Sequence, residues 1–72
     1  GKITLLLDNK VSENIEIQIL NINGQVLETS SIQANLGVNE LDLNLSDYSN
    51  GLYFVRVSSA NSSKTIKLTI SK

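Results

Sequence analysis

The chain has 72 residues, six of them basic and seven acidic, and it contains no proline, cysteine, histidine, methionine or tryptophan. This length limits it to one domain with a thin core, because so short a chain buries only about 60–65% of the surface that its unfolded form exposes. A net charge of −1 without a basic stripe argues against binding to nucleic acid. The missing cysteine and histidine exclude disulfides, thiolate zinc sites and the commonest general base.

Apolar residues alternate with polar ones in five segments of the chain. A period of two is typical of antiparallel strands with one buried face. A weaker strand is predicted from Gln25 to about Ile32, after a turn at Asn23-Gly24, a pair that strongly favours hairpins. The alternating apolar residues are Ile3, Leu5 and Leu7; Ile15, Ile17 and Ile19; Leu41, Leu43 and Leu45; Tyr53, Val55 and Val57; and Ile66, Leu68 and Ile70.

No segment sustains a helical period over three turns, so the chain is predicted to be all-β. Four apolar residues fall on the opposite side of their strands, and in a single open sheet these would face water. We therefore expect two packed sheets, an immunoglobulin-like antiparallel β-sandwich of six to seven strands, formed by one domain over residues 1–72. The four residues are Leu6, Leu20, Leu52 and Phe54.

Signals for catalysis and for metal binding are weak. Glu40 and Asp42 share a strand face, but we interpret them as solvated charges, because a glycosidase pair also needs a cleft. The serines have no histidine to activate them. The segment 47–51 carries oxygen ligands and a glycine but lacks the spaced carboxylates of a calcium loop. We therefore expect no enzyme activity, no metal, no cofactor and no small-molecule substrate.

The three aromatic residues, Tyr48, Tyr53 and Phe54, fall within seven positions. A carbohydrate-binding platform is one interpretation, but it would leave almost no aromatic side chain to stabilise the fold. Tyr53 also alternates in phase with Val55 and Val57. We favour a tyrosine corner, in which a tyrosine near the start of a strand donates its hydroxyl hydrogen to backbone a few residues upstream. Replacing Tyr53 with phenylalanine should then lower stability.

The order of these motifs resembles that of a known family. The segments are "NIEIQILNINGQVLE" (14–28), "GVNELDLNLSDYSNGLYFVRV" (37–57) and "SKTIKLTISK" (63–72). Together they resemble the C-terminal sorting domain, type A, of type IX secretion substrates of Bacteroidetes. The resemblance covers nearly the whole chain, and the order and spacing of the motifs make it more specific than any single motif.

The resemblance assigns family positions to eight residues. Two features depart from the family pattern. Asn21 stands where an aspartate is usual, and the Pro-Asn-Pro expected just upstream is absent, so we expect the chain to be a piece that begins slightly inside the full domain. The matched positions are Gly24, Gly37 and Asn39 of a Gly-x-Asn, Gly51 and Tyr53 of a Gly-x-Tyr, and Lys64, Lys67 and Lys72 of the closing basic strand.

The resemblance implies that the domain is a sorting signal and catalyses no reaction. An N-terminally fused cargo protein would be recognised in the periplasm by the outer-membrane translocon, with a shuttle protein and a sortase as further partners. The cargo would then be secreted or held at the cell surface. The predicted recognition elements are the edge of the last strand (65–71) and the three lysines of that strand. The alternative is a generic immunoglobulin- or fibronectin-like spacer of a secreted enzyme or adhesin.

Overall fold

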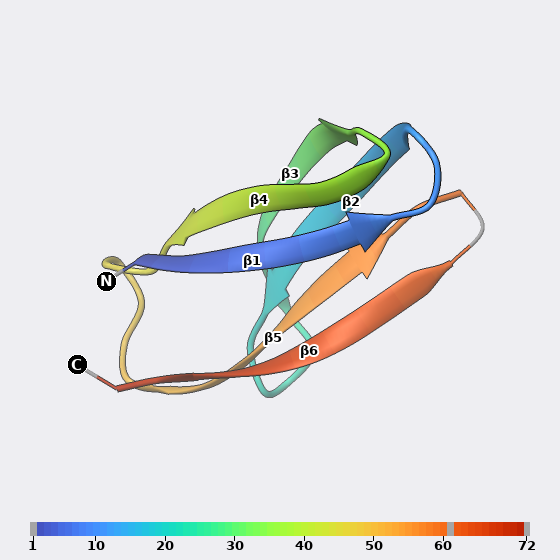
Figure 1. Ribbon diagram of the computed structural model, residues 1–72. Helices are drawn as coiled ribbons and strands as arrows, with labels where there is room; N and C mark the ends of the chain where they lie inside the picture. Colours follow the sequence, from blue (N-terminus) through green and yellow to red (C-terminus); the bar gives the residue numbers. More distant parts are fainter. Residues whose placement is uncertain (1, 61, 72) are drawn as a thin grey trace.

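The computed structural model describes residues 2–60 and 62–71, and this part of the chain contains six strands and no helix (Figure 1). No helix in it could therefore cross a membrane. The prediction of an all-β chain is confirmed, and the segment around Ser30 is not split into two strands. The strands are β1 (Lys2–Asn9), β2 (Glu13–Leu20), β3 (Val26–Ala34), β4 (Gly37–Asn44), β5 (Gly51–Ser58) and β6 (Ser63–Ile70).

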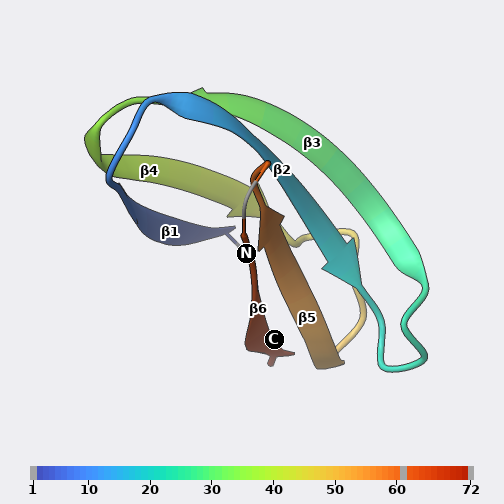
Figure 2. The same ribbon diagram turned by 90° about the vertical axis from the view of Figure 1, so that its right-hand side faces the viewer.

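The strands form two antiparallel sheets, which confirms the immunoglobulin-like sandwich. β1 pairs with β4 in a two-stranded sheet, and the four-stranded sheet has the order β3-β2-β5-β6. Figure 2 shows β1 and β4 apart from β5 and β6. The chain passes from one sheet to the other after β1, β3 and β4, so two of the four strand pairings, β1–β4 and β2–β5, join strands that are not consecutive. In this order β6 is an edge strand of the larger sheet.

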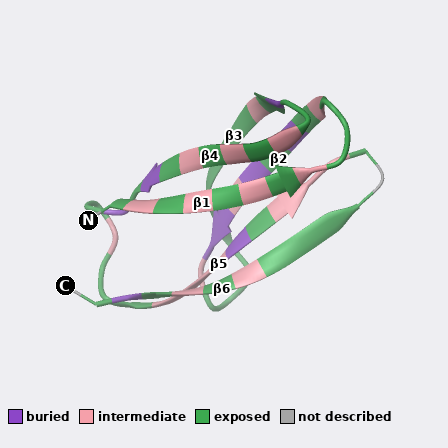
Figure 3. Cartoon of the chain, in the orientation of Figure 1, coloured by how far each residue is buried: buried purple, intermediate pink, exposed green. Residues whose placement is uncertain are grey.

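The core lies between the sheets and is centred on β2. Ile17 on β2 is 1% exposed. Val55, which lies opposite Ile19 on the neighbouring strand β5, is also 1% exposed. Figure 3 shows buried residues on β2 and β5 where the smaller sheet covers them. The alternating residues of all the strongly periodic segments supply the core, as predicted, and Ala34 at the end of β3 joins it without having been predicted. The buried cluster comprises Ile15, Ile17, Ile19, Ala34, Leu43, Leu45, Val55 and Ile70.

The four apolar residues on the opposite side of their strands lie outside the core cluster between the sheets. Leu6 is 66% exposed on the outer side of β1. Leu20 is buried but does not belong to the core cluster, and Leu52 and Phe54 are half-buried outside it. Strict alternation explains this result, because residues next to inward-pointing ones must face outward. The apolar residues that face inward, and not these four, account for the packing of the two sheets.

Candidate recognition surfaces

The aromatic cluster forms the corner between β4 and β5. The Tyr53 hydroxyl donates a 2.8 Å hydrogen bond to the backbone carbonyl of Ser49, four residues upstream. The ring of Tyr53 stacks on that of Tyr48, with centroids 5.5 Å apart and planes inclined by 23°. A further hydrogen bond, from the Tyr48 amide to the Leu45 carbonyl, closes the turn between the strands. The tyrosine corner is confirmed, and these aromatic rings serve the fold.

Tyr48 also ties this corner to β3. Its hydroxyl donates a 2.7 Å hydrogen bond to Glu28 Oε1. Burial, and then the hydrogen bond to the Glu28 carboxylate, raise the pKa of Tyr48 from 10.0 to about 12. Both causes favour the neutral phenol over the phenolate. Glu28 therefore has a structural partner, and the corner connects the end of the small sheet with an edge of the large one.

Asn39 closes the turn between β3 and β4. Its Oδ1 accepts a 3.0 Å hydrogen bond from the Asn35 amide, while its Nδ2 donates to the carbonyls of Asn35 (2.7 Å) and Gly37 (3.2 Å). One carboxamide thus replaces the backbone pairing that the turn lacks. The Leu36 amide donates to Ser12 Oγ at 3.3 Å, which connects this turn with the β1–β2 turn. The Gly-x-Asn motif therefore stabilises the turn through which the chain passes from one sheet to the other.

The turn between β2 and β3 is held by Asn21. Its Oδ1 accepts hydrogen bonds of 3.0 Å from the amides of Asn23 and Gln25. An aspartate carboxylate can accept the same two bonds, so the departure from the family pattern keeps the function of that position. The hairpin predicted at this point is present, but its closing bond runs from the Gly24 amide to the Asn21 carbonyl. The turn is therefore centred one residue before Asn23-Gly24.

The glycines of the three motifs share one backbone property. Gly24, Gly37 and Gly51 have positive φ angles of 83°, 102° and 151°. A Cβ at Gly24 or Gly37 would meet no atom within 4 Å. Backbone conformation, rather than lack of space, therefore selects glycine at these two positions.

The five motif residues are spread over separate turns and do not form one site. Asn39 and Gly37 lie between β3 and β4, Gly51 and Tyr53 begin β5, and Gly24 ends the β2–β3 turn. Each shapes the backbone, and none lines a shared cavity with the others. These motif residues therefore serve the turns and the corner of the fold.

The basic positions of the closing strand lie on both sides of it. Lys67 shares its side with Thr65 and Thr69, whereas Lys64 lies on the side of Ile66 and lines a pocket. Lys67 therefore lies on the polar side of β6 and Lys64 on the apolar side. Lys64 and Lys67 are three residues apart, and an odd spacing places two side chains on opposite sides of a strand, so the sequence already indicated this result. Both side chains are exposed, and Lys72 lies outside the described residues.

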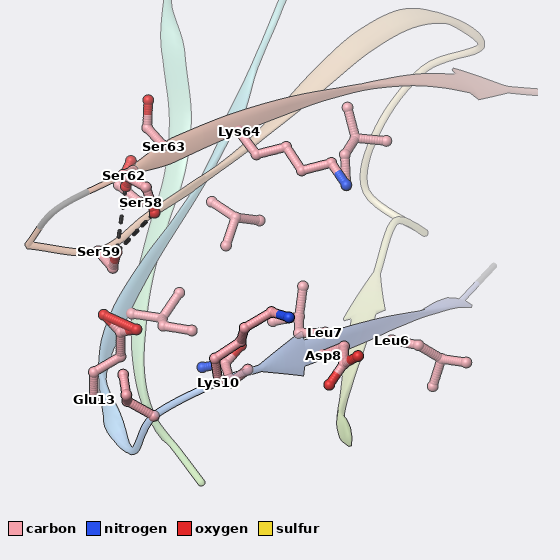
Figure 4. Close-up of a pocket in the computed structure, with 15 residues that line it drawn as sticks. Leu6, Leu7, Asp8, Lys10, Glu13, Ser58, Ser59, Ser62, Ser63 and Lys64 are labelled. Carbon is pink, nitrogen blue, oxygen red and sulfur yellow. Dashed lines mark hydrogen bonds between the residues drawn. The ribbon is translucent and has the colours of Figure 1, made fainter. Parts of the chain in front are cut away.

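A pocket of about 720 Å³ opens between the end of β1 and the start of β6. Figure 4 shows Lys64 on one side of it and Leu7, Asp8 and Lys10 on the other. Asn9 Nδ2 is buried beside this pocket without a hydrogen-bond partner among the described residues. The lining mixes both signs of charge with serines.

The paired carboxylates on β4 lie on the outer side of the small sheet, where Glu40 and Asp42 are exposed. Asp42 Oδ1 accepts a 2.8 Å hydrogen bond from Thr4 Oγ1 on the neighbouring strand. Among residues 2–60 and 62–71, no three acidic residues gather into a group that could hold a metal ion. These carboxylates are solvated strand-face charges, as interpreted from the sequence.

The fold and the turn motifs define a small β-sandwich domain whose recurrent residues shape its turns and corner. The family model of the secretion system C-terminal sorting domain matches residues 1–71. The chain therefore belongs to this family, the sorting domains of type IX secretion substrates. Comparison with curated proteins and with solved structures gives no match. Membership makes the domain a secretion signal whose cargo is exported through the outer membrane, and the family is not a catalytic one.

Proposed function

We propose that residues 1–72 act as a single sorting domain that the outer-membrane translocon recognises, with a shuttle protein and a sortase as further partners. The family match over residues 1–71 carries this proposal. An N-terminally fused cargo protein is exported with the domain, and the sortase removes the domain from it. The domain itself binds neither nucleic acid nor a small-molecule substrate.

The exposed edge of β6 supports a mode of recognition. β6 pairs with β5 along its whole length, from Ser63 opposite Ser58 to Ile70 opposite Gly51, and has no second neighbour in the described sheet. Its other edge offers backbone donors and acceptors to which a strand of the translocon can pair. Lys64, Lys67 and Lys72 add attraction to an acidic surface.

The test is an export assay with a periplasm-targeted fluorescent protein fused ahead of residues 1–72, in a bacterium that has type IX secretion. Deleting β6 is unsuitable, since Ile70 belongs to the core. The variant instead carries Lys64→Glu, Lys67→Glu and Lys72→Glu. Its matched control carries Lys2→Glu and Lys10→Glu, exposed lysines outside β6. Thermal unfolding of the purified domains shows whether each variant is folded.

We expect export of the parent and control fusions and periplasmic retention of the β6 variant. Export of a folded β6 variant contradicts the role of the lysines. Retention of every fusion contradicts the sorting function and favours the alternative, a spacer module. A fusion with the domain placed ahead of the fluorescent protein further distinguishes a sorting signal from a spacer module, because a sorting signal acts only at the C-terminus.

A further inference from the structure

The outer side of the four-stranded sheet carries an apolar row that crosses all four strands. Val26 on β3 lies opposite Leu20 on β2, Leu20 lies opposite Phe54 on β5, and Phe54 lies opposite Lys67 on β6. Leu52 shares this side, two residues before Phe54. We name these residues, together with Arg56, the Phe54 face. Val26 is 44% exposed, Leu52 and Phe54 are half-buried and Leu20 is buried, yet none of the four belongs to the core cluster between the sheets.

The charges nearest the apolar row are positive. Lys67 stands at the end of the apolar row, and Arg56 is two residues after Phe54 on the same side of β5. Arg56 Nη1 donates a 3.4 Å hydrogen bond to Gln18 Oε1, a neutral partner on β2. The carboxylate on this side of β2, Glu16, lies opposite Ser58 and four residues from Leu20. The Phe54 face is therefore an apolar row bordered by two cations.

The outer side of the small sheet shows the opposite pattern. Its exposed apolar residues, Leu6 and Val38, stand among Asp8, Glu40 and Asp42. Leu6 lies opposite Glu40, and Val38 lies opposite Asp8. The two outer surfaces of the sandwich thus differ in sign although the chain as a whole is nearly neutral. A partner that prefers acidic or basic surfaces therefore distinguishes one side of this domain from the other.

We propose that the Phe54 face docks a protein of the export machinery that presents an apolar patch bordered by carboxylates. This inference rests on the proposed function and names the surface that recognition uses. Four strands about 4.8 Å apart and eight residues long at about 3.3 Å per residue offer about 500 Å². Contact over that area matches the small interfaces of transient complexes. Transient binding suits a signal that must leave its receptor after transport.

The decisive variant of the export fusion carries Arg56→Glu and Lys67→Glu. Its matched control carries Lys2→Glu and Lys10→Glu, two exposed lysines outside the four-stranded sheet. A second pair compares Phe54→Ser with Leu6→Ser, an apolar truncation on the other outer surface. Because Phe54→Ser can also lower stability, the charge variants decide the outcome. Each domain is purified, and its thermal unfolding is compared with that of the parent.

We expect the Arg56→Glu, Lys67→Glu fusion to lose roughly tenfold or more of its export, because the two reversed charges would meet the carboxylates of the partner and like charges repel. The Lys2→Glu, Lys10→Glu control and Leu6→Ser should stay close to the parent. Equal export of the folded Arg56→Glu, Lys67→Glu variant overturns the docking face and leaves the sorting function standing. Retention of the unmodified parent overturns the sorting function and this inference together.

A photo-crosslinking amino acid at Val26, which is 44% exposed, tests contact directly, with Leu6 as the control position. We expect an adduct with a component of the export machinery from position 26 and none from position 6. The adduct should disappear when Arg56 and Lys67 are both replaced by glutamate. Adducts of equal yield from both positions, or an adduct between two copies of the domain, overturn the proposal.

Discussion

The Tyr53 hydroxyl and the Ser49 carbonyl, 2.8 Å apart, fix the corner through which the chain passes from the small sheet to the large one. The bond spans the turn whose sequence carries the Gly-x-Tyr motif. It therefore explains why a tyrosine, and not another large apolar residue, begins β5.

Tyr53→Phe removes this hydrogen bond and keeps the ring that stacks on Tyr48. The free energy of unfolding should fall by about 1 kcal/mol, which lowers the thermal midpoint by about 4–8 °C in a domain of this size. Thermal unfolding followed by circular dichroism measures the change. Ser49→Ala keeps the carbonyl acceptor and serves as the control, with little expected effect. An unchanged midpoint for Tyr53→Phe would contradict the role of the corner.

Asn39→Ala removes three hydrogen bonds from the β3–β4 turn and should destabilise the domain by about 1–3 kcal/mol. Asn39→Asp keeps the acceptor for the Asn35 amide but loses both bonds that Nδ2 donates. Its loss of stability should therefore be smaller than that of alanine but measurable. Urea denaturation of the two variants and the parent gives the ranking, and equal stability of all three would show that the turn does not depend on Asn39.

Gly37→Ala should lower the free energy of unfolding by about 1–2 kcal/mol, because its φ of 102° is unfavourable for a residue with a Cβ. The open space around this position excludes a clash as the cause. The control is Ser30→Ala, at an exposed position on β3. A glycine substitution at Ala34 is unsuitable as a control, because Ala34 is fully buried. A Gly37→Ala variant as stable as the parent would mean that the turn relaxes to negative φ.

The raised pKa of Tyr48 predicts a pH dependence of stability. Its pKa increases from 10.0 to about 12 on folding, so the folded state favours the neutral phenol. The resulting stabilisation is complete below about pH 10 and is lost as the pH rises to about 12. Urea denaturation of the parent and of Tyr48→Phe should show a stability difference that shrinks across this interval. Glu28→Gln, which removes one cause of the shift, should narrow the interval, and a constant difference would contradict the assignment.

Several features of the fold could be predicted from local pattern alone. Ile15, Ile17 and Ile19 alternate with polar residues, and all three are buried. Asn23-Gly24 indicated a hairpin, and Tyr53 indicated a corner. Such signals depend on neighbours in sequence, since strand period and turn chemistry are properties of a few adjacent residues.

The sequence by itself determined the strands, the turns that separate them and the family to which they belong. Tertiary structure decided that β1 pairs with β4 instead of the adjacent β2, and that Ala34 closes the core. It also aligned Val26, Leu20, Phe54 and Lys67 in one row across four strands. Long-range pairing and register set these relationships, and many pairings are compatible with the same alternation until the inward faces pack against each other. The proposed docking face, assembled from four strands, therefore becomes visible only in the folded domain.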